Sequence, residues 1–204
     1  MTTAPTVKLP PVEELRAGEL VLRPWRPDDV PVIEALVLRN LEHLRPWMPW
    51  VAAEPSRIED RYALVDRWHE AVQARTDWIC GIFVRGEPAG SSGLHQRRGP
   101  GVLEIGYWLD QSFVGRGIAS ATAHVLTTFA FASPETAAVE IWHDRANARS
   151  RAVPRRLGYE LVAEAPAAEP LAPGEEGVNC IWRMTRSRWQ EQRRCFDPTV
   201  PPAT

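Results

Sequence analysis

Residues 104–119 read EIGYWLDQSFVGRGIA and decide how the chain folds. The part up to Asp110 has the short apolar pattern of a strand, and Val114 to Ala119 form a glycine-containing turn that opens a helix. Glycines allow consecutive backbone N–H groups to point to one side, and the start of a helix adds further N–H groups and the positive end of its dipole. This stretch therefore predicts an anion-binding loop between a strand and a helix.

Two phosphate-binding motifs that use similar glycines do not fit this loop. The dinucleotide-binding pattern G-x-G-x-x-G is not completed, because Ala119 and Ser120 lie where it would continue, and no early βαβ unit precedes it. The Walker phosphate loop requires Gly-Lys-Ser/Thr, which the sequence lacks. The loop therefore belongs to neither of these classes of nucleotide-binding protein.

A second informative segment follows the first at a fixed distance. Residues 139–150 read VEIWHDRANARS, and residues 157–159 read LGY. The pattern predicts a strand over 137–143 and then a helix over 147–157, which Gly158 ends as a C-cap.

The rest of the chain adds strands and helices in a mixed order. Ser56-x-x-Glu59 has the spacing of a capping box, and residues 166–177 form a loop rich in Pro, Ala and Gly. The strands are expected over 19–26, 78–85, 87–97, 102–110, 137–143, 159–165 and 178–185, and the helices from Pro27, from Ser56, over 117–131 and over 147–157. This order predicts a single mixed α/β domain.

The composition excludes several functional classes. The chain has 204 residues, of which 44% are hydrophobic, and a formal charge of −2. We therefore expect a globular domain without the global basic field that favours nucleic acid. No stretch approaches the roughly 20 apolar residues of a membrane span, and the N-terminus lacks the pattern of a signal peptide. We expect a cytoplasmic protein with no nucleic-acid and no membrane partner.

Proline-rich ends set the expected domain boundaries. We expect a flexible N-terminal segment over 1–18, the domain over 19–186 and a C-terminal tail over 187–204. The tail carries Trp189, which either covers a partner subunit or packs on the domain.

Cysteine and histidine spacings give no sign of a disulfide framework or a metal site. Cys80, Cys180 and Cys195 are odd in number and have no C-x-x-C spacing. His143 and Asp144 are adjacent, which is not a metal-ligand spacing. We therefore expect no metal.

Together the two informative segments resemble the GNAT superfamily of acyl-CoA-dependent N-acetyltransferases. The E-I-G-Y-W-L strand, the G-R-G-I-A loop, the N-x-x-S helix start and the L-G-Y close are similar to the branch that acetylates ribosomal-protein N-termini. LRPWRPDD at 22–29 and RPWMPW at 45–50 resemble the same branch, and the resemblance covers about residues 19–185. It implies an α/β fold with a central, mostly antiparallel sheet, splayed at the acyl-CoA site and covered by helices on both faces.

The resemblance also implies how acetyl-CoA, the acyl donor, would bind. In the family, the loop equivalent to 114–119 binds the pyrophosphate through backbone amides, and the pantetheine arm lies between the strands equivalent to 102–110 and 137–143. Val114 stands where many members have Gln or Arg. The expected cofactor-binding residues are Tyr107, Trp108, Leu109, Val114, Gly115, Arg116, Gly117, Ile118, Ala119 and Asn147. Trp108 has a second interpretation as a core residue.

Acetyl transfer to an amine needs a base, since an alkyl amine is mostly protonated at neutral pH. Glu104 aligns with the strand glutamate that often fills this role in the superfamily, and its alternative is a solvated charge at the strand edge. If residues 98–101 form the hairpin turn, His95 lies opposite Glu104 on the same face. We therefore expect His95 to share the base role or to tune the pKa of Glu104.

The departing thiolate needs a proton. Many superfamily members supply it from a tyrosine seven residues after the helix asparagine, but here that position is Pro154. The proline lacks an N–H and is expected to kink the helix. The resemblance therefore assigns the acid to Ser150, whose alternative role is to cap its own helix.

The sequence says least about which amine accepts the acetyl group. Trp47 and Trp50 are expected either to wall the acceptor pocket or to pack in the core. The leading function is direct transfer of acetyl from acetyl-CoA to a primary amine, most of all a protein or peptide N-terminus. The alternatives are a small-molecule amine, such as an antibiotic or a polyamine, and a non-catalytic acyl-CoA-binding module. The sequence does not decide between a monomer and a homodimer.

Overall fold

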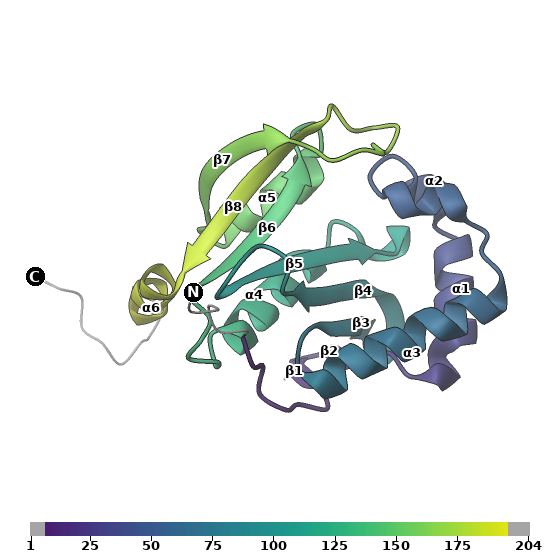
Figure 1. Cartoon of the computed structure of the whole chain (residues 1–204), viewed down its shortest axis with the longest axis horizontal. Helices are drawn as coiled ribbons and strands as arrows, with labels where there is room; N and C mark the ends of the chain where they lie inside the picture. The colour runs from purple at the N-terminus through teal and green to yellow at the C-terminus, as the bar shows by residue number, and fades with distance from the viewer. Residues whose placement is uncertain (1–6, 196–204) are drawn as a thin grey trace, which may run out of the picture.

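The computed structural model describes residues 7–195, whose strands form one eight-stranded sheet (Figure 1). The strand order is β1-β2-β3-β4-β5-β6-β8-β7. The strands are β1 (Leu15–Ala17), β2 (Leu20–Pro24), β3 (Trp78–Val84), β4 (Glu87–His95), β5 (Val102–Leu109), β6 (Ala138–Asp144), β7 (Glu160–Pro166) and β8 (Val178–Thr185). Every neighbouring pair is antiparallel except β5 with β6, which confirms the predicted mixed, mostly antiparallel sheet.

The sheet is splayed between its two parallel strands. β5 and β6 are paired only from Val102 with Ala138 to Ile105 with Ile141. Beyond that point β5 continues to Leu109 and β6 to Asp144 without pairing to each other. The facing backbone edges of both strands are therefore open over their second halves, as the family resemblance implies.

Helices cover both faces of the sheet (Figure 1). The α-helices are α1 (Val30–Leu38), α2 (Leu41–Leu44), α3 (Ile58–Ala74), α4 (Ile118–Ala130), α5 (Ala148–Arg156) and α6 (Arg186–Cys195), and the 3-10 turns are η1 (Pro27–Asp29), η2 (Pro49–Ala53) and η3 (Gln111–Phe113). Apolar side chains of α1 and α3 build one core, and those of α4 build the larger core on the opposite face.

Strand β5 contributes to both faces because its side chains alternate. Leu103 and Ile105 are buried in the larger core with α4, whereas Trp108 packs against the core of α1 and α3. Glu104 and Gly106 share the face of Trp108, because residues two apart in a strand point the same way. This alternation separates Tyr107 from Trp108, although the two are neighbours in the sequence.

The predicted helix start at Ser56 is wrong in its details. Helix α3 begins at Ile58, and its N-cap is Arg57, with no side-chain cap hydrogen bond. The backbone N–H of Ser56 donates instead to the Glu54 carboxylate at 2.8 Å, and Glu54 also pairs with Arg61 at 2.7 Å. The ion pair between Glu54 and Arg61 therefore fixes this turn in place of a capping box.

Both terminal segments are packed more tightly than the sequence suggests. In the segment expected to be flexible, Val7 and Leu9 are 1% and 2% exposed in the main core, and β1 pairs with β2. At the other end, α6 buries Trp189 against Phe131 and His124, so this part of the tail packs on the domain. Residues 1–6 and 196–204 lie outside the described part.

No helix in the described residues is both long enough and apolar enough to cross a membrane. Cys80 and Cys180 are buried free thiols, and the side chain of Cys195 lies outside the described part.

Candidate active site

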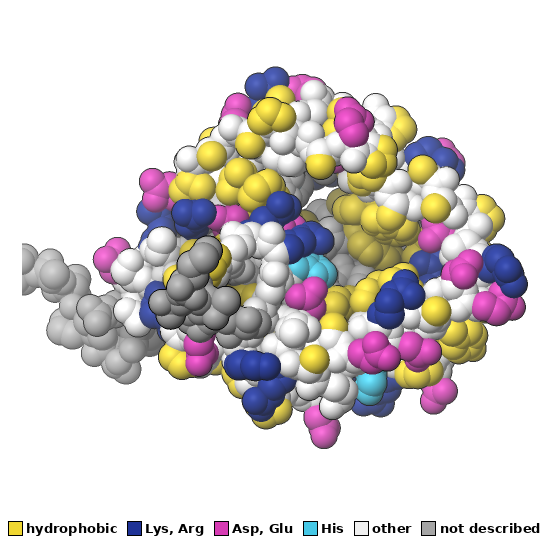
Figure 2. Space-filling view, viewed as in Figure 1, with side chains coloured by type: hydrophobic (Ala, Val, Ile, Leu, Met, Phe, Trp, Pro, Cys, Tyr) yellow, Lys and Arg dark blue, Asp and Glu magenta, His cyan; other side chains and the backbone are white. Residues whose placement is uncertain are grey.

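A cavity of about 350 Å³ opens where β5 and β6 diverge. Four segments line it: residues 43–48 around α2, the end of β5, the loop and helix start at 114–120, and helix α5 with Asn147. Figure 2 shows the molecule hollowed between the β6–β8–β7 part and the α1–α3 part, with hydrophobic side chains in its depth and Lys or Arg side chains on its rim. The splay of the sheet therefore creates the site.

The glycine loop forms one end of the cavity. Gly115 and Gly117 have φ of 81° and 78°, values that an L-residue rarely adopts. No heavy atom lies within 4 Å of the place where a Cβ on either glycine would stand. Arg116 turns its guanidinium over the Phe113 ring at 5.3 Å instead of lining the cavity. The space above the loop and the start of α4 therefore fit an anion held by backbone N–H groups.

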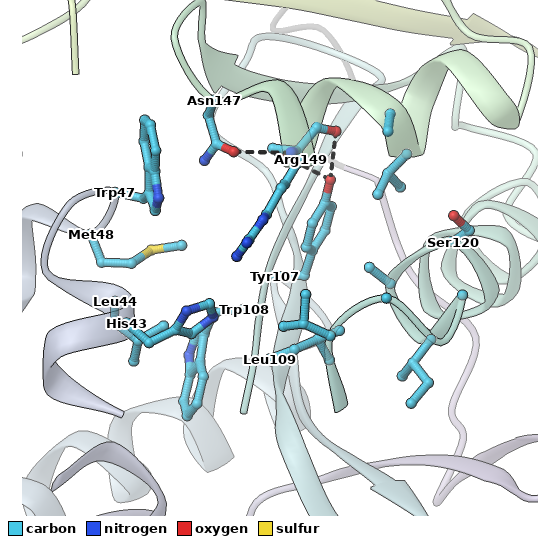
Figure 3. Close-up of a pocket in the computed structure, with 18 of the residues that line it drawn as sticks. His43, Leu44, Trp47, Met48, Tyr107, Trp108, Leu109, Ser120, Asn147 and Arg149 are labelled. Carbon is cyan, nitrogen blue, oxygen red and sulfur yellow. Dashed lines mark hydrogen bonds between the residues drawn. The ribbon is translucent and has the colours of Figure 1, made fainter. Parts of the chain in front are cut away.

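Asn147 caps helix α5 and also faces the cavity. Its side-chain oxygen accepts a hydrogen bond from the Ser150 backbone N–H at 3.0 Å. Its amide nitrogen has no partner among the described residues, and Figure 3 shows this nitrogen pointing away from the helix. One side chain therefore starts the helix and leaves a donor for a carbonyl, as a pantetheine arm would offer.

Tyr107 and Ser150 meet on the α5 side of the cavity (Figure 3). The Tyr107 hydroxyl lies 3.0 Å from the Ser150 hydroxyl and 3.3 Å from the Ser150 carbonyl oxygen. Burial raises the pKa of Tyr107 to about 12, so this phenol stays protonated at neutral pH. The Ser150 hydroxyl is therefore not the cap of its helix and has a fixed hydrogen-bonding partner.

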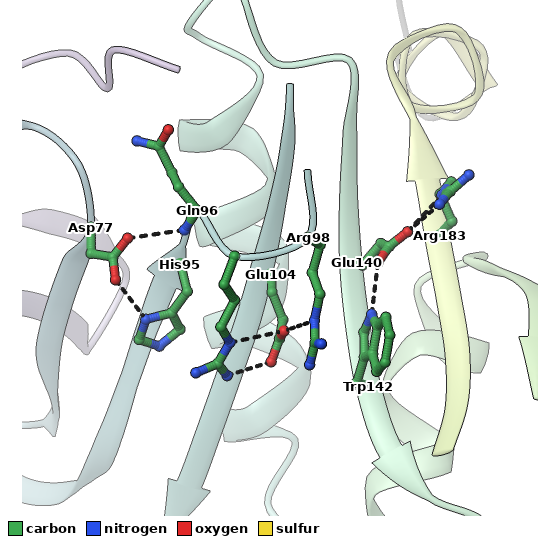
Figure 4. A network of polar contacts seen from close by, with 9 residues as sticks. Asp77, His95, Gln96, Arg98, Glu104, Glu140, Trp142 and Arg183 are labelled. Carbon is green, nitrogen blue, oxygen red and sulfur yellow. Dashed lines mark hydrogen bonds and ion pairs between the residues drawn. The ribbon is translucent and has the colours of Figure 1, made fainter. Parts of the chain in front are cut away.

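Glu104 is held by two arginines (Figure 4). Arg97 Nε donates to one carboxylate oxygen at 3.0 Å, and Arg98 donates to the same oxygen. Although burial raises the pKa of Glu104, the two guanidinium groups outweigh it and hold this pKa below its ordinary value. A buried carboxylate of lowered basicity that is already fully paired is a poor proton acceptor.

His95 lies opposite Glu104 in the β4–β5 register, as the hairpin spacing predicts. No hydrogen bond joins their side chains, because His95 Nδ1 lies 3.1 Å from Oδ2 of Asp77. The second ring nitrogen, Nε2, lies along the sheet, 3.8 Å from where a Cβ on Gly106 would stand. The ring therefore extends toward the part of β5 that lines the cavity, although neither His95 nor Glu104 is itself in the lining.

Aromatic side chains wall the cavity on the α2 side. Trp47 and Trp108 line it, and Trp50 lies beside Trp108 with ring centroids 6.3 Å apart. Because Trp108 is on the face of β5 opposite Tyr107, it belongs to this wall and not to the α5 side where Tyr107 lies. His43 and Arg149 also line this end of the cavity (Figure 3).

Asp110 links the end of α1 to the 3-10 turn η3 that precedes the glycine loop. Its carboxylate accepts hydrogen bonds from Arg39 Nε at 2.6 Å, Asn40 Nδ2 at 2.9 Å and the Ser112 backbone N–H at 2.8 Å. In the sequence, Asp110 is marked only as the end of a strand. Asp77, His43 and Arg149 carry no local motif, and only the fold places them near the site.

The splayed sheet, the glycine loop before α4 and the capped start of α5 together define an acetyltransferase fold. Residues 19–160 match the sequence profile described as "Acetyltransferase (GNAT) domain". The chain belongs to the GNAT family of N-acetyltransferases.

Relatives of this chain include acetyltransferases of ribosomal proteins. YdaF of Bacillus subtilis (strain 168), described as a ribosomal N-acetyltransferase, is 30% identical over 146 residues, which are 69% of this chain and 77% of YdaF. RimL, described as a ribosomal L7/L12 alpha-N-protein acetyltransferase in complex with coenzyme A, is 25% identical with a TM-score of 0.74, covering 86% of this chain and 99% of RimL.

Two further solved structures share the fold at lower identity. The microcin C7 self-immunity acetyltransferase MccE, in complex with acetyl-CoA and AMP, is 21% identical with a TM-score of 0.75 over 83% of this chain and 93% of MccE. RimJ of Mycobacterium smegmatis, in complex with CoA-disulfide, is 21% identical with a TM-score of 0.73 over 85% of this chain and 86% of RimJ.

Proposed function

We propose that this protein transfers acetyl from acetyl-CoA to the N-terminal amine of a protein or peptide. The observation that carries the proposal is the cavity itself, which joins a glycine anion loop to an open strand edge and an aromatic wall. The similarity to YdaF and RimL supports a protein N-terminus as the acceptor.

The donor side of the site fits acetyl-CoA. Backbone N–H groups of 115–119 would hold the pyrophosphate, and the open edge of β5 beyond Ile105 would pair with the amides of the pantetheine arm. Asn147 would donate its free amide hydrogen to a carbonyl of that arm. Acetyl-CoA supplies an acetyl group activated as a thioester.

We assign the base to His95 and not to Glu104. Asp77 holds the ring through Nδ1, which leaves Nε2 to take a proton from the amine directly or through one water. Glu104 keeps Arg97 and Arg98 in place beside this path. As the amine nitrogen forms its bond to the acetyl carbon, the proton it loses moves to His95.

Ser150 supplies the proton that the leaving sulfur needs when the carbon–sulfur bond breaks. The Tyr107 and Ser150 hydroxyl oxygens lie 3.0 Å apart, so when the Ser150 hydrogen points at the sulfur, the Tyr107 hydroxyl can donate to the Ser150 oxygen and replace the proton that Ser150 gives up. No cysteine lies in the two motifs, in keeping with direct transfer without an acyl-enzyme.

Thiol release by the purified full-length chain tests the proposal. The amines are peptides with a free N-terminus, the same peptides with a blocked N-terminus but a free lysine, a polyamine and an aminoglycoside. We expect release with the free N-termini alone, and mass spectrometry should place the acetyl group on the α-amine. Thiol release only with small-molecule amines would contradict the proposal that the acceptor is a protein N-terminus. Tight acetyl-CoA binding without any thiol release would favour a non-catalytic binding module. Failure to bind acetyl-CoA would contradict the whole assignment.

A further inference from the structure

The charged lining of the cavity is basic. Arg149 and Arg156 are in the lining, and none of the lining residues in the described part of the chain is Asp or Glu. An acceptor with several positive charges loses hydration on entering such a cavity and finds no carboxylate to replace it. The lining therefore opposes polycationic acceptors and favours one that carries a negative charge.

The two arginines have different tasks. Arg156 donates to the Ser120 hydroxyl at 3.2 Å, close to the glycine loop. Arg149 has no hydrogen bond or ion pair with any residue that the structure describes. Figure 3 shows its side chain running past Tyr107 toward His43 and Trp108, and away from Ser120. The free guanidinium of Arg149 therefore lies at the acceptor end of the cavity and not at the phosphate end.

No carboxylate within residues 7–195 is positioned to pair with this guanidinium. Asp110 is near enough to act on His43 by its charge, but three donors from Arg39, Asn40 and Ser112 already occupy its oxygens. Burial and the charge of Arg149 together lower the pKa of His43, so this imidazole is neutral at neutral pH. Arg149 is thus the single permanent positive charge at this end of the described cavity lining.

We propose that the acceptor carries a carboxylate close to its reacting amine and that Arg149 binds this carboxylate. A guanidinium presents paired N–H groups that match the two oxygens of a carboxylate. Arg149 and Ser150 line the same cavity, so a carboxylate bound by Arg149 lies in the cavity that holds the reacting centre. An acidic side chain at the second position of a peptide offers this chemistry, and so does the α-carboxylate of a free amino acid. This inference rests on the proposed function.

Matched acceptors test the inference on the full-length protein. We would measure kcat and KM for peptides that begin Ala-Asp, Ala-Asn and Ala-Lys and are otherwise identical, for free alanine, for alanine amide and for spermidine. The variants are Arg149→Gln, Arg149→Lys and Arg155→Gln. Arg155 is an exposed arginine of the same helix that does not line the cavity, which makes it the matched control.

We expect the Ala-Asp peptide to exceed the Ala-Asn peptide in kcat/KM by about 10- to 100-fold, as a charge-assisted hydrogen-bonded pair gives. Arg149→Gln should remove this preference through KM and leave the Ala-Asn peptide within about twofold, while Arg155→Gln should behave as the wild type. Arg149→Lys should keep part of the preference, because the charge remains but the paired donors are lost.

Three outcomes would overturn the inference. These are equal turnover of the Asp and Asn peptides, a preference for the Lys peptide or spermidine, and an Arg149→Gln effect confined to the affinity for acetyl-CoA. If no peptide is acetylated but free alanine is, and alanine amide is not, the carboxylate requirement holds while the peptide acceptor is wrong. The two proposals therefore fail in distinguishable ways.

Discussion

The hydroxyl oxygen of Tyr107 lies 3.0 Å from that of Ser150, on a turn of α5 that a proline has altered. In a regular helix the N–H of residue 154 would bond to the carbonyl of Ser150, but Pro154 has no N–H. The Tyr107 hydroxyl lies 3.3 Å from this carbonyl oxygen. Pro154 occupies the position at which many family members have a tyrosine. Because Pro154 leaves the Ser150 carbonyl without its helical N–H partner, the Tyr107 hydroxyl from β5 lies close to both this carbonyl and the Ser150 hydroxyl.

The first prediction concerns this pair. Ser150→Ala should lower kcat by about 100-fold or more and leave the affinity for acetyl-CoA unchanged, because only the proton donor is removed. Tyr107→Phe should lower kcat less, by about 10-fold, because Ser150 keeps its proton but loses its partner. Tyr62→Phe removes a hydroxyl from an exposed residue outside the cavity and serves as the control. Unchanged turnover in Ser150→Ala would leave Ser150 with a structural role only.

The second prediction separates His95 from Glu104 by comparing catalysis with stability. If His95 is the base, His95→Gln should lower kcat by about 100-fold and leave the affinity for acetyl-CoA unchanged, because only the proton acceptor is removed. Glu104→Gln should lower kcat much less and instead reduce the free energy of unfolding by about 1–3 kcal/mol, because Arg97 and Arg98 lose their partner. A large loss of kcat in Glu104→Gln with little change in His95→Gln would return the base role to Glu104.

The hairpin spacing was enough to predict that His95 faces Glu104, but not that its partner is Asp77. A strict two-residue turn at Arg85-Gly86 would place Asp77 opposite Leu94. A register shift between Ile82 and Phe83 moves the pairing by one residue, so that Trp78 lies opposite Leu94 and Asp77 comes beside His95. A bulge of this kind depends on packing across the sheet, and no local sequence motif predicts it.

The glycine loop and the N-x-x-S helix start were predictable because local sequence dictates their backbone geometry. The side chains at the acceptor end were not. Arg149 had no predictable partner because it has none among the residues that the structure describes, and the part played by Asp110 depends on Arg39 and Asn40, about 70 positions away. The burial of Val7 and Leu9 was not predicted, because the prolines near them indicated a flexible segment.

The third prediction tests whether the glycine loop binds the anionic part of acetyl-CoA. Gly117→Ala should reduce the free energy of unfolding by about 1–2 kcal/mol, since an L-residue is strained at φ of 78°. It should also weaken acetyl-CoA binding by about 10-fold, because relief of the strain rotates the backbone N–H groups. Gly86 has φ of 82° in the β3–β4 turn and, like Gly117, has open space around it, so Gly86→Ala should cost similar stability without any loss of binding. Equal binding by the two variants would contradict an anion site at the loop.

The fourth prediction concerns the pH dependence of stability through Asp110. Although burial raises the pKa of Asp110, hydrogen bonds from Ser112, Asn40 and Arg39 outweigh it and hold this pKa well below its ordinary value. A carboxylate with a lowered pKa in the folded state stabilises the fold above its unfolded pKa of about 3.9 and loses this contribution as the pH falls toward the folded value.

Asp110→Asn should therefore reduce the free energy of unfolding by about 1–3 kcal/mol at pH 7. The difference from the wild type should shrink as the pH is lowered from about 4 to about 2, because Asp110 takes up a proton there in the unfolded chain but stays ionised in the folded protein. Denaturant unfolding at several pH values measures this difference, and carboxylates shared by both proteins cancel from it. Asp66→Asn, on the exposed side of α3, should show no such dependence. A constant difference across this pH range would mean that Asp110 acts through its shape and hydrogen bonds and not through its charge.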